Sequence, residues 1–301
     1  MFDCLNNDQK TDAENKKIIF NPDLLSRGYF LSLIYHSYDA MQRINNLNVY
    51  TKGNKKNRAV LFVHGFPFDH RMWDAQVAAL EENYFCILYD IRGLGESLPG
   101  DGQYTMESFV DDLESIIDHL NLNKPVLCGL SMGGYISLRS VERMQHKFSA
   151  LILCDTKSEA DTNEGKIKRA AGIKQINIYG VNKFVSEFLP NCFSVNFIET
   201  NSNEYNKILQ RSSANSPLGI KGCLLAMAGR TDTTGFLGKI EIPSLLICGQ
   251  MDTITPPSVM KNMSDQIQNS KFVIINDAAH MAPVEKPDEV NLAISEFLAG
   301  L

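Results

Sequence analysis

Short apolar runs alternate with longer amphipathic stretches along most of this chain. The runs are continuous, as in strands that are covered on both faces, and they occupy residues 59–63, 85–89, 125–128, 150–154, 243–248 and 271–275. The stretch at residues 105–120 instead repeats apolar residues with the 3.6-residue period of a helix. Similar helical spacing is expected at residues 72–82, 259–268 and 287–298. This alternation predicts an α/β protein whose parallel sheet is covered by helices on both faces.

Two stretches depart from the alternation. Residues 41–51 look like two short strands around an Asn-Asn turn. Residues 155–236 contain several helix-like pieces and no strong strand, which predicts a helical lid inserted at about residues 157–236. We therefore expect an N-terminal extension over residues 1–40, polar and loose at first and then a helix or docked arm. One domain would follow over residues 41–301.

The run at residues 125–128 leads directly into Gly129-Leu130-Ser131-Met132-Gly133, a Gly-x-Ser-x-Gly motif, and then into a helix start. Between a buried strand and a helix the chain must turn sharply, which would force Ser131 into a strained conformation and expose its Oγ above the sheet. A glycine-rich strand-to-helix turn that has no catalytic role, or one that binds a phosphate, would have the same sequence pattern. The motif therefore gains weight only from partners elsewhere in the chain.

Two partners follow later strands. Asp252 comes just after the strand at residues 243–248, and His280 just after the last strand. Functional groups of parallel sheets gather at the carboxyl ends of strands. The order Ser, Asp, His is the order of a hydrolase triad, in which the imidazole deprotonates the hydroxyl and the carboxylate orients the imidazole. Each residue also has an ordinary interpretation: Asp252 as the cap of the next helix, His280 as a loop histidine bonded to backbone.

Several assignments around this triad have alternatives. Asp155 also follows a strand and is a rival acid, although Asp252 is favoured because Asp155 leads into the lid. An oxyanion hole would use the backbone N–H groups of Met132 and Phe66. His64 is either a second base or, as we favour, a brace for the turn. Asp90 and Arg92 look architectural, and Trp73 could wall the pocket or the core.

Composition narrows the function classes. The 301 residues are 44% hydrophobic with a net charge of −6 and no basic stripe, which argues against nucleic acid as a partner. The His and Cys residues show no ligand spacing, so no metal is expected. Four of the seven cysteines lie in apolar strand-like runs, namely Cys86, Cys128, Cys154 and Cys248, and are expected to be reduced. No apolar run has the roughly 20 residues of a membrane span, and no signal peptide is evident, so a cytoplasmic protein is expected.

The motifs resemble those of the α/β-hydrolase fold family from about residue 42 to residue 298. The resemblance rests on His64-Gly65-Phe66-Pro67, on Asp90-x-Arg92-Gly93-x-Gly95-x-Ser97 and on the glycine-flanked Ser131. Within that family the segments at residues 153–162 and 249–257 look most like those of 3-oxoadipate enol-lactonases and related esterases. The resemblance implies a serine hydrolase without metal or organic cofactor. The N-terminal extension departs from the family pattern and is expected to be dispensable for chemistry.

These observations predict a hydrolase for small-molecule carboxylic esters or lactones that acts through an acyl-enzyme on Ser131. The lid would set substrate size. Its apolar residues would form a roof or the packing face of its helices, and they are Ile173, Ile176, Ile178, Tyr179, Phe184, Phe188 and Leu189. The alternatives within the fold are a cofactor-free perhydrolase or haloperoxidase-like enzyme and a C–C bond hydrolase. The alternative from another class is a ligand-binding receptor.

Overall fold

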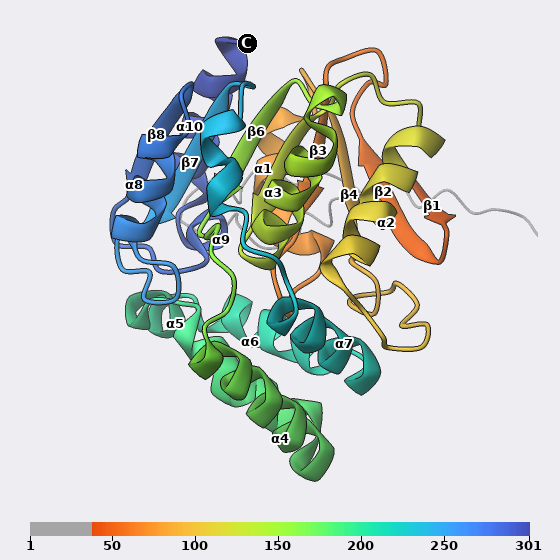
Figure 1. The fold of residues 1–301 in the computed structure, drawn as a ribbon, viewed down its shortest axis with the longest axis vertical. Coiled ribbons are helices and arrows are strands. Elements are labelled where there is room, and N and C mark those ends of the chain that lie inside the picture. The colour runs from red at the N-terminus through yellow and green to blue at the C-terminus, as the bar shows by residue number, and fades with distance from the viewer. Residues whose placement is uncertain (1–37) are drawn as a thin grey trace, which may run out of the picture. The chain divides into compact units, whose positions relative to one another are not determined.

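The computed structural model describes residues 38–301, which are built around one eight-stranded sheet (Figure 1). The strand order is β1-β2-β4-β3-β5-β6-β7-β8. The strands are β1 (Ala40–Ile44), β2 (Leu47–Lys52), β3 (Ala59–Val63), β4 (Phe85–Tyr89), β5 (Val126–Leu130), β6 (Ala150–Cys154), β7 (Ser244–Gly249) and β8 (Ser270–Ile275). β1 and β2 pair antiparallel, as do β2 and β4, and the remaining pairs are parallel. The predicted α/β fold with a mostly parallel sheet is confirmed.

Helices cover both faces of the sheet. α2 (Met106–His119), α3 (Met132–Met144) and α8 (Pro257–Gln266) lie on one face, and α1 (Asp74–Leu80) and α10 (Pro287–Ala299) lie on the other (Figure 1). The sequence explains the start of α2, because the Thr105 and Ser108 side chains each accept a hydrogen bond from the other's backbone N–H at 3.1 Å. Strands β3 to β6 are buried along their whole length, as their continuous apolar runs predict.

Some helix boundaries differ from the sequence prediction. The helix expected at residues 72–82 is a 3-10 turn, η2 (His70–Trp73), followed by α1, because the Asp69 side chain caps the turn by accepting from the Arg71 N–H. The helix expected at residues 259–268 begins earlier and ends earlier, as α8. Two short elements were not predicted: η3 (Gln145–Lys147) and α9 (Ala282–Glu285), a single turn that begins two residues after His280.

The insertion between β6 and β7 is helical, as expected. The helices α4 (Asn163–Phe188), η4 (Leu189–Asn191), α5 (Val195–Thr200), α6 (Ser202–Ser213) and α7 (Pro217–Ala228) lie below the sheet in Figure 1, and η5 (Thr234–Lys239) packs against α8 beside the sheet. α4 is kinked at Gly180, whose φ of 84° suits glycine. The chain enters and leaves the part of the insertion that holds α4 to α7 at one place, where the N–H and the hydroxyl of Thr233 both donate to the Ser158 carbonyl, at 3.0 and 3.1 Å.

The expected helix or arm at residues 18–40 lies largely outside the described residues, as does Cys4. Within residues 38–301, six free cysteines are buried, including the four in apolar runs, which agrees with reduced, structural thiols. None of the helices in this part of the chain is both long enough and apolar enough to cross a membrane.

Candidate active site

Ser131 stands at the corner between β5 and α3 in a strained conformation, as predicted, with φ 53° and ψ −113°. The flanking glycines are required by close approaches. A Cβ on Gly133 would lie 2.2 Å from the Val63 carbonyl oxygen, and one on Gly129 would lie 2.4 Å from the Gly133 carbonyl oxygen. Thr156 holds the corner by donating its hydroxyl to the Ser131 carbonyl at 2.8 Å. The local sequence therefore presents the Ser131 side chain at the start of a helix.

The three side chains that the sequence proposes as a triad meet in space. His280 Nε2 lies 2.8 Å from Ser131 Oγ, and His280 Nδ1 lies 2.8 Å from Asp252 Oδ2. Asp252 and His280 are each only 3% exposed, so water competes little for these contacts. The arrangement has the connectivity that proton transfer from a serine hydroxyl requires.

The Asp252 carboxylate accepts four hydrogen bonds, of which the sequence reasoning anticipated only the one from His280. Oδ1 accepts from the backbone N–H groups of Ile254 and Thr255, and Oδ2 accepts from His280 and from the Thr255 hydroxyl at 2.6 Å. Burial alone would raise the pKa of Asp252, but His280 and the Thr255 hydrogen bonds lower it below its usual value. The Asp-x-x-Thr spacing is the signal that could have identified Thr255.

The rival acid, Asp155, lies near Asp252. Among the hydrogen bonds of residues 38–301, none joins Asp155 to His280. Asp155 directly follows β6 with a φ of 43°, and its Oδ1 accepts from the Gly249 N–H at 2.7 Å. Its Oδ2 is buried and unpartnered among the described residues. Burial, and then the nearby Asp252 carboxylate, raise the pKa of Asp155 well above its usual value. The structure thus places Asp252, not Asp155, against the imidazole.

His64 has the bracing geometry that we favoured over a role as second base. Its Nε2 accepts from the Ile91 N–H at 2.8 Å, which leaves Nδ1 to donate to the Gly65 carbonyl at 2.9 Å. Burial lowers the pKa of His64, in keeping with a neutral ring. Both nitrogens therefore bind backbone and fix the turn that carries Phe66.

The two predicted oxyanion donors come from two segments. Phe66 lies in the turn after β3, and Met132 follows Ser131 at the corner between β5 and α3. Met132 is the first residue of α3, so its N–H has no acceptor within the helix. The Phe66 N–H makes no hydrogen bond to any group in residues 38–301. Both donors are thus available to a ligand oxygen.

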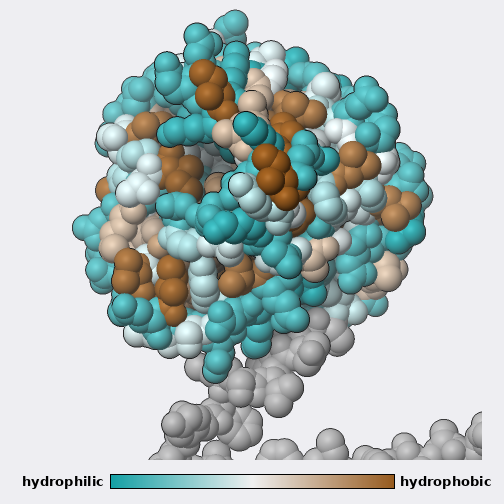
Figure 2. Space-filling view, turned by 90° about the horizontal axis from the view of Figure 1, so that it is seen from below, coloured by the Kyte–Doolittle hydropathy of each residue, from teal (hydrophilic) through white to brown (hydrophobic). Residues whose placement is uncertain are grey.

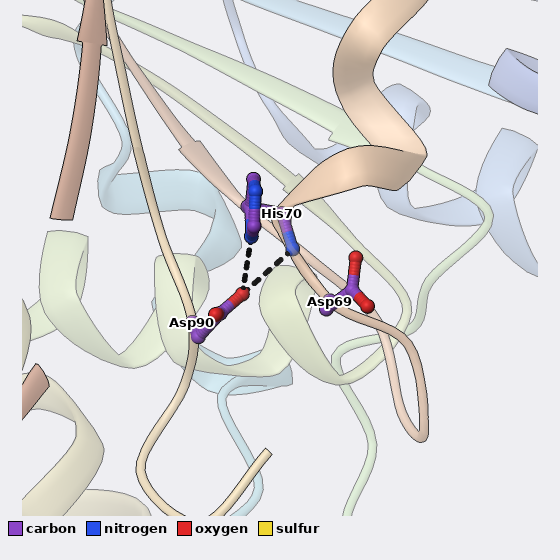
Figure 3. A group of neighbouring side chains, drawn as sticks. All are labelled: Asp69, His70 and Asp90. Carbon is purple, nitrogen blue, oxygen red and sulfur yellow. Dashed lines mark hydrogen bonds and ion pairs between the residues drawn. The ribbon is translucent and has the colours of Figure 1, made fainter. Parts of the chain in front are cut away.

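Two clusters of the described residues have the composition of metal ligands: Asp69, His70 and Asp90, and Asp155, Cys248 and Asp252. In Figure 3 the N–H and Nδ1 of His70 converge on one oxygen of Asp90, at 2.9 and 2.7 Å. Asp69 pairs instead with the Arg71 guanidinium. Asp90 also accepts from the Glu96 N–H, and Arg92 forms a bidentate pair with Asp112. These contacts support the architectural interpretation of Asp90 and Arg92.

Aromatic residues of the lid reach the turn that carries Phe66, which is called the oxyanion turn below for its proposed role. The Phe66 ring centroid lies 6.1 Å from that of Phe184 and 5.6 Å from that of Phe188. Other apolar lid residues do not form a roof: Ile178 and Tyr179 are exposed, and Ile176 and Leu189 are buried. Trp73 belongs to the core, fully buried 5.2 Å from the ring of Phe62. The lid side of the molecule is largely hydrophilic, with separate hydrophobic patches near a hollow (Figure 2).

Known proteins resemble this chain in sequence and in fold. An esterase structure from Thermogutta terrifontis superposes with a TM-score of 0.83 at 34% identity, covering 87% of this chain and 98% of the esterase. 3-Oxoadipate enol-lactonase 1 of Acinetobacter baylyi is 29% identical over 85% of this chain and 94% of its own length. A putative non-heme chloroperoxidase of Synechocystis is 27% identical over 84% of this chain and 95% of its own length. The family model described as the alpha/beta hydrolase fold matches residues 58–287. The chain therefore belongs to the alpha/beta hydrolase fold family.

Proposed function

We propose that this protein is a serine hydrolase that cleaves carboxylic esters or lactones through an acyl-enzyme. The observation that carries the proposal is the pair of 2.8 Å contacts that His280 makes with Ser131 and Asp252. A serine hydroxyl is a weak nucleophile at neutral pH, and an imidazole held by a carboxylate can accept its proton during attack.

In the proposed reaction, Ser131 Oγ attacks the carbonyl carbon and His280 Nε2 accepts the hydroxyl proton. Asp252 stabilises the imidazolium, and the N–H groups of Phe66 and Met132 bind the oxyanion. His280 then donates its proton to the leaving alkoxide, which in a lactone stays attached to the acyl group. A water molecule, deprotonated by His280, attacks the acyl-enzyme and releases the acid and free Ser131.

The substrate class rests on similarity and on the site's surroundings. The A. baylyi relative is named for an enol-lactone, and the T. terrifontis structure is described as an esterase. The rings of Phe184 and Phe188 beside Phe66 place an apolar lid surface next to the proposed oxyanion hole. We propose small esters or lactones, with the lid setting the size of the acyl group.

Replacement of Ser131 tests the proposal. We expect Ser131→Ala to lower kcat for p-nitrophenyl acetate by at least about 10⁴-fold, because the nucleophile is lost while the fold is kept. Ser186→Ala, at an exposed position of α4, is the matched control and should retain full activity. A Ser131→Ala protein as active as the wild type would rule the proposal out. Tight ligand binding without multiple turnover on a panel of esters and lactones would favour the receptor alternative.

The chloroperoxidase-named relative favours one second candidate, a perhydrolase. In that reaction hydrogen peroxide replaces water as the nucleophile that attacks the acyl-enzyme, and a peracid is released. Peracid formation from acetate or its esters, measured beside ester hydrolysis, separates the two. Hydrolysis that exceeds peracid formation at millimolar peroxide supports the hydrolase.

A further inference from the structure

A cavity of about 200 Å³ lies between lid helix α6, the turn η2 with the start of α1, and the segment that follows His280. It borders two of the segments that carry proposed catalytic groups. Phe68 lies two residues after Phe66, and Met281 directly follows His280. Met72, which also lines the cavity, accepts a hydrogen bond from the Gly65 N–H through its sulfur at 3.4 Å. A molecule in this cavity would therefore contact the framework of the active site.

The cavity wall is largely apolar, with charged side chains at one part of it. Met72, Ala75, Ile208 and Val284 are among its apolar residues. The charged ones are Asp69, Arg71, Glu204 and Arg211. Such a wall suits a ligand with an apolar body and one charged end.

The pairing of these four side chains decides the sign of that charge. Asp69 and Arg71 neutralise each other in a two-point ion pair, with contacts of 2.9 and 2.5 Å. Glu204 pairs with Lys207 at 3.2 Å. The Arg211 guanidinium makes no ion pair and donates no hydrogen bond within residues 38–301. Among the four charged side chains of the cavity wall in this part of the chain, only Arg211 therefore has no partner of opposite charge.

We propose that this cavity binds the carboxylate of a small organic acid, with Arg211 as the anchor and the apolar wall holding the carbon chain. A guanidinium presents a planar fork of donors that matches a carboxylate. The volume suffices for a molecule of several non-hydrogen atoms, since one water needs roughly 10–15 Å³ of such space. The carboxylate belongs either to a free acid or to the far end of a carboxylate-bearing ester.

Calorimetry with the full-length protein tests the binding directly, with hexanoate as probe and 1-hexanol as its uncharged match. We expect hexanoate to bind, 1-hexanol to bind much more weakly, and Arg211→Gln to weaken hexanoate binding at least about tenfold. Glu204→Gln removes a negative charge from the same wall and should leave hexanoate binding equal or tighter. Arg58→Gln, which removes the same charge at an exposed position outside the cavity, should change nothing.

A second variant, which changes no charge, tests the cavity independently in case Arg211→Gln does not fold. Ala75→Leu narrows the cavity and should also weaken hexanoate binding, with an unchanged circular dichroism spectrum. Equal hexanoate affinity in the wild type and Arg211→Gln would overturn the proposal. So would no binding to the wild type, or an equal affinity for 1-hexanol.

Kinetic measurements distinguish a free acid from a carboxylate-bearing ester as the source of the carboxylate. This kinetic test rests on the proposed function. If the substrate carries the carboxylate, Arg211→Gln lowers kcat/KM for monomethyl glutarate at least about tenfold and leaves dimethyl glutarate unchanged. If the ligand is a free acid, hexanoate changes the hydrolysis of both esters, and Arg211→Gln abolishes that effect. A protein inactive on both esters contradicts the proposed function alone, because calorimetry still decides the binding.

Discussion

At the residue scale, the most unusual feature is the left-handed backbone of Ser131, a conformation that costs on the order of 1–3 kcal/mol. Neighbouring residues maintain it: Gly129 and Gly133 allow the close approach, and Thr156 binds the Ser131 carbonyl. The strain and the triad partners could be predicted from the sequence, because Gly-x-Ser-x-Gly and strand ends are local signals. Thr255 was missed although the Asp-x-x-Thr spacing was present, because a threonine after an aspartate has many ordinary roles and the spacing is a weak signal.

The Thr255 hydroxyl is expected to be a positioning group for Asp252. Thr255→Val keeps the shape of the side chain and removes the 2.6 Å hydrogen bond to Oδ2. Because a hydrogen bond to a charged group contributes about 1.5–3 kcal/mol, we expect kcat/KM for p-nitrophenyl acetate to fall about tenfold or more. Thr253→Val, the same change at an exposed position two residues away, should have no effect. Equal loss in both variants would contradict a specific role for Thr255.

Asp155 gives a prediction about pH and stability. Its pKa is raised well above its usual value near 4, first by burial and then by Asp252. The folded state therefore keeps a proton that the unfolded state releases above pH 4, so this residue's contribution to stability falls as pH rises from 4 toward the raised pKa. Asparagine has no such proton and still accepts from the Gly249 N–H.

We therefore expect the free energy of unfolding of Asp155→Asn to fall less than that of the wild type between pH 5 and 8. At pH 8 the variant should be at least as stable, with a gain on the order of 1 kcal/mol. Urea unfolding at several pH values measures this. Asp265→Asn, at an exposed position on α8, serves as control. An equal loss of stability in Asp155→Asn and the wild type would show that the carboxyl is ionised in the folded protein.

At the element scale, strands were easier to predict than helix boundaries. A strand buried on both faces must be apolar throughout, so β3, β4 and β6 could be read from the sequence to the residue. Helix ends depend on caps and on neighbours distant in sequence, as the Asp69 cap of η2 illustrates. In α4 the apolar residues point several ways across the Gly180 kink, so no periodicity could separate Phe184 and Phe188 from the exposed Ile178 and Tyr179.

The contact of α4 with the oxyanion turn is expected to matter for catalysis. Phe188→Ala removes one of the two rings beside Phe66. Aromatic pairs contribute about 0.5–1.5 kcal/mol, so we expect kcat/KM for a short ester to fall about three- to tenfold as the Phe66 N–H loses its support. Tyr179→Ala, an exposed aromatic on the same helix, should retain wild-type kinetics. Unchanged kinetics in Phe188→Ala would separate the lid from the oxyanion turn.

At the scale of the whole molecule, the proposed site assembles three side chains and the backbone N–H of Phe66 from four places in the chain on one edge of the sheet. Strand order and chain connectivity bring Ser131, Asp252 and His280 together, and general rules for parallel sheets anticipate this. The cavity beside α6 could not be anticipated, because it depends on how lid and domain pack. The boundary expected at residues 40 and 41 stays a prediction.

Contacts of residues 38–40 sharpen the test of that boundary. The Tyr38 hydroxyl donates to Asp74 at 2.6 Å, and Asp39 accepts from the Gly53 N–H at 2.8 Å. We expect chains 36–301 and 41–301 to keep esterase activity, with the melting temperature of the shorter one lower by about 3–8 °C. Thermal unfolding and p-nitrophenyl acetate hydrolysis measure this. Folded chain 36–301 without activity would give the extension a role in chemistry.

The hydrogen bonds between Ser158 and Thr233 have a consequence for how this protein can change. They hold the two ends of the segment between residues 158 and 233 side by side. That segment is therefore an insertion whose two junctions with the rest of the domain are adjacent. Swapping it for the equivalent segment of a relative is expected to leave Ser131, Asp252 and His280 in register. Under the proposed function, selectivity would then change by exchange of one contiguous segment, without any change in the three proposed catalytic residues.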